Sequence, residues 1–115
     1  MAITEREKIT TDTGDAAVVN AASGATKFTI GAVAVTDAEG TPADAATGTG
    51  AVEFLSGATD RYETLLDAAG DAVVIDFAGP LTFNAEGYIK GFRVTPTALA
   101  GDGVIGMRLV VGSYT

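Results

Sequence analysis

Acidic side chains are the residues of this sequence with the greatest capacity for chemistry. The chain carries 15 Asp and Glu residues but no His and no Cys. The missing His removes the commonest general base and transition-metal ligand, and with it Ser-His-Asp hydrolysis. The missing Cys excludes disulfides and thiolate metal sites. What remains is chemistry that carboxylates perform alone, by binding a cation through oxygen or by acting as an acid–base pair.

Three acidic residues lie in the segment 37–50, DAEGTPADAATGTG. Asp37, Glu39 and Asp44 could bind Ca²⁺ through oxygen ligands, but their spacing does not match an EF-hand. Segments of this length without a strand or helix pattern are commonly functional or mobile loops. We interpret the three as exposed loop residues and expect no metal site.

A second acidic group, Asp60, Asp67, Asp71 and Asp76, raises the alternative of glycoside hydrolysis. That reaction needs two carboxyl groups across a cleft, one of them with a raised pKa. Asp67 and Asp71 flank a Gly-containing turn, and hydrogen bonding to their own backbone explains them more simply. The G-x-G at 48–50 lacks the third glycine and following helix of a dinucleotide-binding motif. We therefore expect no catalytic residue, no cofactor and no enzymatic activity.

Tyrosines are the aromatic residues of this chain that have a polar end, since it has no Trp. On an exposed sheet face such side chains stack on sugar rings or anchor protein interfaces, and partly buried structural tyrosines are the plainer alternative. The residues that we predict to lie in an interface are Ile3, Thr4, Ile9, Tyr62, Tyr88 and Tyr114.

The net charge of −8 argues against two classes of partner. Nucleic acids require a basic footprint, and anionic membranes attract basic segments, so we expect no nucleic acid and no membrane partner. The first residues lack the apolar region of a secretory signal, and no apolar run approaches the roughly 18 residues of a membrane helix. We expect a soluble protein that stays in the cytoplasm or is assembled into something there.

Residues 1–15, MAITEREKITTDTGD, contain few apolar side chains. That is too little for an element buried within its own domain, so we interpret them as an extended arm or an edge strand that pairs elsewhere. We expect a neighbouring chain to hold this arm by strand addition. A short helix with Thr4 as N-cap and Glu7 in a capping box is the alternative. Residues 16–115 would then form one domain of ordinary size.

Short strand-like patterns recur through the middle of the chain. Strands are predicted at 16–20, 26–36, 51–56 and 79–83, separated by turn-like segments. Within 26–36 the apolar face shifts by one residue, and a bulge near Gly31 would account for that shift.

The segment 60–77, DRYETLLDAAGDAVVIDF, fits either a helix or a hairpin. A helix would have Asp60 as N-cap and Glu63 in a capping box. A hairpin would place YETLL opposite AVVIDF across the loop DAAGD. The β-branched run 73–75 must be a strand, so we favour the hairpin.

Two alternating apolar runs flank the Pro- and Gly-rich gap PTALAGDG in the last segment, 87–115. Each is predicted to be a long antiparallel strand with one buried and one solvated face. Gly91 and Gly106 have the parity opposite to the apolar residues, where they would let another chain lie against the sheet. The pattern as a whole indicates an all-β fold, a single-domain antiparallel β-sandwich or jelly-roll-like fold with a thin core of Val, Ile, Leu and Phe.

The second half of the chain, 57–114, resembles small virion proteins encoded among the structural genes of tailed bacteriophages. The features that carry the resemblance are the YETLLDAAGDAV hairpin, the GYIKGFRV strand and the final GMRLVVGSY strand. The resemblance implies a β-sandwich without enzymatic activity, present in many copies on a capsid, tail or fibre. The implied subtype that we choose is a capsid decoration (cement) protein, located in the virion and assembled in the host cytoplasm.

Such a protein would act as a homo-oligomer, most commonly a trimer, and bind the major capsid protein or another virion protein. A different class of function is a tail or fibre module that recognises a host-surface glycan through Tyr62, Tyr88 and the 37–50 loop.

Overall fold

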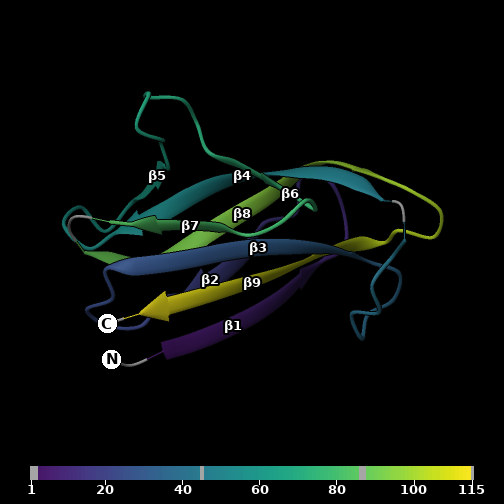
Figure 1. Cartoon of the computed structure of the whole chain (residues 1–115), viewed down its shortest axis with the longest axis horizontal. Coiled ribbons are helices and arrows are strands. Elements are labelled where there is room, and N and C mark those ends of the chain that lie inside the picture. The colour runs from purple at the N-terminus through teal and green to yellow at the C-terminus, as the bar shows by residue number, and fades with distance from the viewer. Residues whose placement is uncertain (1–2, 45, 86–87, 115) are drawn as a thin grey trace.

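Two antiparallel sheets lie face to face in this chain and enclose its core, as Figure 1 shows. The computed structural model describes residues 3–44, 46–85 and 88–114, which form strands, turns and loops without a helix among them. The strands in chain order are β1 (Ile3–Thr10), β2 (Ala17–Asn20), β3 (Lys27–Val35), β4 (Thr47–Ser56), β5 (Tyr62–Thr64), β6 (Val74–Asp76), β7 (Leu81–Asn84), β8 (Ile89–Ala100) and β9 (Gly106–Tyr114). The predicted fold class, a single all-β antiparallel sandwich, is confirmed.

The strands are divided between the two layers, and the chain crosses from one layer to the other several times. The first sheet has the order β1-β9-β3-β7, and the second has the order β2-β8-β4-β5, with β6 also pairing with β4. Every hydrogen-bonded pair in both sheets is antiparallel. The edge strands β7, β5 and β6 are short, with four, three and three residues. The two sheets therefore end unevenly on the side formed by these three short strands, which we call the ragged margin.

The core lies between the layers and is filled by the inward-facing residues of both sheets. An edge-to-face aromatic contact joins them, because the rings of Phe28 on β3 and Phe92 on β8 lie 5.2 Å apart at 75°. Phe83 on β7 contacts both rings, at 5.7 and 6.1 Å. The largest fully buried side chains are Phe28, Phe92, Ile30, Met107, Leu109, Val35, Val52, Val94 and Val111. This set agrees with the predicted filling by Val, Ile, Leu and Phe, with Met107 in addition.

The predicted arm is a strand of the domain. β1 pairs with β9 of the same chain along its whole length, from Ile3 opposite Tyr114 to Thr10 opposite Met107. Thr10 is buried, and its hydroxyl donates to the Met107 carbonyl at 3.3 Å. The expectation that a neighbouring chain holds this segment is therefore wrong. An edge strand is held by one ladder of backbone hydrogen bonds, which needs no apolar side chains.

No bulge interrupts β3, contrary to the prediction near Gly31. The register between β3 and β9 runs unbroken from Lys27 to Val35. Burial alternates regularly through this segment, with Phe28, Ile30, Ala32 and Ala34 buried, so the buried face does not shift at Gly31. The register shifts fall between β4 and β8 instead, after Thr49 and after Leu55.

The two long strands of the last segment do not pair with each other. β8 belongs to the second sheet and β9 to the first, so their apolar faces meet across the core. The connection is also shorter than predicted, since Pro96 lies inside β8 opposite Gly50 at a register shift, where no regular ladder hydrogen bond is required. Figure 1 shows the resulting turn, residues 101–105, at one end of the sandwich.

The glycines of these two strands permit close backbone approach, as predicted, but the approaching backbone belongs to the same chain. A Cβ on Gly91 would meet the Val19 carbonyl oxygen of β2 at 2.7 Å. A Cβ on Gly106 would overlap the Thr10 carbonyl group of β1. Both glycines therefore serve the internal contacts of the domain.

The helix alternative for 60–77 is wrong, and the predicted hairpin is confirmed at its tip. Val73 N–H donates to the Leu65 carbonyl at 2.8 Å, and Leu66 and Ala72 form a β-bridge. The turn is closed as expected, since Asp67 Oδ1 accepts the N–H groups of Ala69 and Asp71 at 2.9 and 3.0 Å. Beyond the tip, β5 and β6 are not paired with each other as predicted, since each pairs with a different part of β4, Glu53–Leu55 and Thr49–Ala51.

Candidate interaction surface

An open apolar groove of about 740 Å³ lies at the ragged margin of the sandwich, between β7 and the 62–76 hairpin. We call it the mouth groove. Its lining is Phe54, Ser56, Ala58, Glu63, Leu65, Leu66, Asp67, Ala68, Val73, Leu81, Phe83, Asn84, Ala85, Tyr88 and Ile89. It forms because β7 and β5 are short edge strands, so the two sheets do not close over the core on this side.

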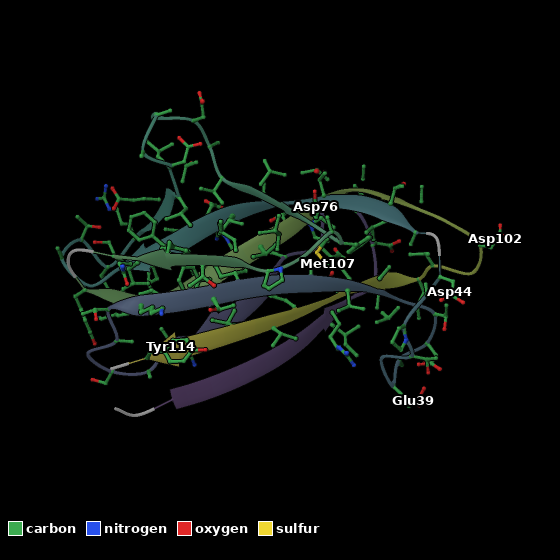
Figure 2. The ribbon with its side chains drawn as sticks, viewed as in Figure 1. Glu39, Asp44, Asp76, Asp102, Met107 and Tyr114 are labelled. Carbon is green, nitrogen blue, oxygen red and sulfur yellow. The ribbon has the colours of Figure 1, made fainter. Side chains whose placement is uncertain are left out.

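Three large apolar side chains in the mouth groove are exposed to solvent. Leu66 is 56% exposed, Tyr88 47% and Leu81 36%. They come from the hairpin tip, from the segment before β8 and from the start of β7, and Figure 2 draws the side chains of this region as sticks. Grouped exposed apolar side chains of this kind are typical of interaction surfaces, whereas single ones are ordinary.

The ionisable rim of the mouth groove is acidic. Glu63 and Asp67 line it, and no Lys or Arg does so among the residues that the structure describes. A nearby cation, Lys90, is already engaged, because its Nζ donates to Asp60 Oδ1 at 3.0 Å. That hydrogen bond raises the pKa of Lys90. The groove therefore presents apolar surface with net negative charge at its edge.

A rigid polar cluster lies on the outer face of the second sheet. Arg93 on β8 donates from Nε and Nη2 to the two carboxylate oxygens of Glu53 on β4, at 3.1 and 2.9 Å. Its guanidinium lies 4.2 Å from the centroid of the Tyr62 ring on β5. The hydrogen bonds that Arg93 donates to the Glu53 carboxylate raise the pKa of Arg93, while desolvation opposes the rise. Paired on one side and stacked on the other, this side chain is held in one orientation.

The predicted interface residues lie in three separate parts of the structure and do not form one surface. Tyr88 lines the mouth groove, and Tyr62 lies on the outer face of the second sheet. Tyr114 ends β9 in the first sheet, with Lys27 Nζ 5.8 Å from its ring centroid, and Ile3 lies beside it in register. Thr4 and Ile9 also lie on β1, where Ile9 is half-buried and the side chains of Ile3 and Thr4 fall outside the described ones.

Sequence reasoning missed the two exposed leucines of the mouth groove. Leu65 and Leu66 are consecutive, so a strand must turn one of them away from the core, and that signal was present in the sequence. The exposure of Leu81 had no such signal, because it results from the position of β7 at the edge of its sheet among the strands that the structure describes. The Arg93–Glu53 pair was missed because it depends on the register between β4 and β8.

Asp37, Asp67 and Asp76, three of the carboxylates considered for chemistry, accept hydrogen bonds from the backbone of their own loops. Asp37 Oδ1 accepts the N–H groups of Glu39 and Thr41, at 3.1 and 3.0 Å, and Oδ2 accepts the Thr41 hydroxyl at 2.7 Å. The bond from the Thr41 hydroxyl is the largest cause of a lowered pKa of Asp37. Within residues 3–44, 46–85 and 88–114, no three acidic side chains gather in a way that could hold a metal ion.

The 37–46 loop and the tyrosines of the second sheet lie at opposite ends of β4. The loop enters β4 at Thr47, whereas Tyr62 pairs with Leu55 and the Tyr88 carbonyl accepts the Gly57 N–H at 2.9 Å. Figure 2 labels Glu39 and Asp44 at one end of the long axis. Loop and tyrosines therefore do not form one binding site.

The part of the chain that the structure describes contains no helix of the length and apolarity needed to cross a membrane. No protein-family model matches the sequence, and no curated protein matches it either. A chain from the solved structure titled "Bacillus endospore appendages form a novel family of disulfide-linked pili" is similar to it in structure. That alignment covers 99% of this chain and 87% of the other, with 15% sequence identity and a TM-score of 0.39.

Proposed function

We propose that this chain is a non-enzymatic structural protein of a virion, an external capsid decoration protein that stabilises a phage head by bridging capsomers. The observation that carries the proposal is the mouth groove, with Leu66, Leu81 and Tyr88 exposed together at the margin of the sandwich. The resemblance of residues 57–114 to small phage virion proteins supports the subtype. In this proposal the chain acts as a homo-oligomer, with a trimer as the expected form, and binds the major capsid protein.

The physical argument rests on burial of the groove. When a partner covers apolar surface that is exposed in the monomer, the free energy of association becomes more favourable by about 25 cal/mol per Å² of surface buried. Aromatic and apolar anchors grouped at the centre of an interface supply most of the binding energy, while a charged rim sets specificity. The net charge of −8 keeps such a protein soluble until it docks.

A pair of matched substitutions tests this function. Leu66 and Val74 are 56% and 57% exposed, but of the two only Leu66 lines the mouth groove. Each would be changed to Ser, and retention on purified heads of the virus that encodes the chain would be measured by quantitative mass spectrometry. We expect hundreds of copies per head for the unchanged protein and for Val74→Ser, and at least about a tenfold loss for Leu66→Ser. A dozen copies or fewer for the unchanged protein would contradict a shell position.

The second candidate, a tail or fibre module that binds a host-surface glycan, is favoured by the Tyr62–Arg93–Glu53 cluster. Aromatic and charged side chains fixed on a flat sheet face are suited to stacking on a sugar ring and bonding its hydroxyls. A glycan array separates the two functions. Retention that is lost in Tyr62→Ala and kept in Leu66→Ser would support glycan binding against capsid docking.

A further inference from the structure

The free edge of β7 borders the mouth groove. Among the strands that the structure describes, β7 pairs with β3 alone, so its second edge is open. Ala85 N–H donates to the Thr26 carbonyl at 2.8 Å, which fixes the phase of the ladder between these segments. Residues of an antiparallel pair point their N–H and C=O alternately toward and away from the partner. Counting back from Ala85, the backbone groups of Thr82 and Asn84 point away from β3.

The side chains beside this edge form one wall of the groove. Leu81 and Phe83 of β7 line it, and Leu65, Leu66 and Val73 of the hairpin line the opposite wall. A strand added to β7 would continue the alternation of the first sheet. Every second side chain of that strand would therefore enter the groove and cover its apolar walls.

The charge at the rim distinguishes between occupants. Glu63 and Asp67 lie there without a basic residue in the lining, and Asp67 Oδ1 already accepts two backbone N–H groups. A second copy of the chain would bring a second acidic rim and the same net charge of −8. A segment carrying Lys or Arg would complement this rim, because opposite charges across an interface favour association.

We propose that the mouth groove and the free edge of β7 bind an extended segment of a partner protein by strand addition. The segment has apolar side chains at every second position and a Lys or Arg beside Glu63 and Asp67. Strand addition supplies affinity through the main chain and specificity through alternate side chains. The inference rests on the proposed function only in that the partner is taken to be a capsid protein.

A short blocked peptide in which Val and Thr alternate between terminal lysines is the probe. A control peptide has Glu in place of both lysines. Binding to the full chain would be followed by amide hydrogen exchange and chemical shifts, with affinity from the titration. We expect the Lys peptide to slow exchange of the Thr82 and Asn84 amides and to bind about tenfold more tightly than the Glu peptide.

Two variants of the chain separate edge pairing from groove filling. Thr82→Pro removes the N–H that points to the free edge, which an edge strand tolerates. It also breaks the 3.0 Å hydrogen bond between the Thr29 and Thr82 hydroxyls, so Thr29→Val is the matched control that breaks this bond alone. We expect Thr82→Pro to abolish peptide binding and Thr29→Val to keep it, with thermal unfolding showing both variants folded.

Four results would overturn the inference: no binding of the Lys peptide, equal affinity for the two peptides, binding that leaves the Thr82 and Asn84 amides unprotected, or self-association through the groove in ultracentrifugation. Head retention tests the proposed function separately. If Leu66→Ser is lost from heads while the peptide does not bind, the groove docks on the capsid without strand addition and this inference alone fails.

Discussion

Gly106 and Thr10 lie so close across the β1–β9 contact that no side chain fits between them, because a Cβ on Gly106 would overlap the carbonyl group of Thr10. Backbone atoms of a paired strand cannot shift as a flexible side chain can. The identity of residue 106 is therefore fixed by the path of the first strand, which lies nearly a hundred residues earlier in the chain.

We predict that Gly106→Ala destabilises the domain by about 1–3 kcal/mol, the usual cost of forcing extra volume into a filled site. Gly79→Ala is the matched control, since a Cβ there would have no neighbour within 4 Å and its φ is not in the left-handed region. Urea unfolding would measure both. Equal stability of the two variants would show that β1 does not lie on β9 as described.

Removing residues 1–10 is predicted to destabilise the domain strongly and to cause self-association. The truncation would leave the edge of β9 unpaired and remove the buried Thr10, whose hydroxyl donates to the Met107 carbonyl. An unpaired edge is a template for pairing with other chains. Thermal unfolding and analytical ultracentrifugation would test this. A truncated chain that stays monomeric with unchanged stability would restore the view of the segment as an arm.

Replacing Arg93 with Lys is predicted to lower the midpoint of thermal unfolding, although by less than Gly106→Ala. A lysine keeps the charge but loses the paired hydrogen bonds to Glu53 and the stacking on Tyr62. In a Tyr62→Leu background the same replacement should cost less, since the stacking has already been removed. Additive effects of the two changes would indicate that the ring and the guanidinium do not interact.

The Asp37 loop is predicted to loosen only in acid. Hydrogen bonds to the carboxylate, foremost from Thr41, lower the pKa of Asp37 from its ordinary value of 3.8. A lowered folded-state pKa gives stability that is fully present above the unfolded value and lost as pH falls through the folded one. Protection of the Glu39 and Thr41 amides, measured against their intrinsic exchange rates at each pH, should therefore fall below that pKa and be unaffected by this group near neutrality. Thr41→Val should raise the pKa of Asp37, and an unchanged value in an NMR titration would contradict the assignment.

Local patterns in the sequence predicted the elements whose own residues decide their structure. The Asp67 turn, the 60–77 hairpin and the buried parity of Phe28, Ile30 and Ala32 follow from turn chemistry and alternation within a few residues. The predictions were wrong where the structure of a segment is determined by a strand that is distant in the sequence. β1 is stabilised by the ladder to β9, and the side of β3 that is buried is set by its pairing with β9, which continues unbroken past Gly31.

The candidate site was predictable only in part, for the same reason. Tyr88 was predicted as an interface residue and does line the mouth groove. The groove itself results from the absence of a strand beyond β7 among the described residues, and an absence of pairing leaves no pattern in the strand concerned. Leu66 and Leu81 line the same groove because β7 and the hairpin lie at the same margin of the sandwich, an arrangement that the local sequence around each leucine does not indicate.

The position of β9 has a consequence for synthesis on the ribosome. This strand lies between β1 and β3 in the first sheet, so the N-terminal strand is translated before its hydrogen-bonding neighbour exists. A nascent chain lacking residues 106–114 can assemble much of the second sheet but leaves β1 and β3 without their shared partner. Completion of the first sheet therefore waits until residues 106–114 have been translated, and until then β1 and β3 lack the strand that pairs with both of them.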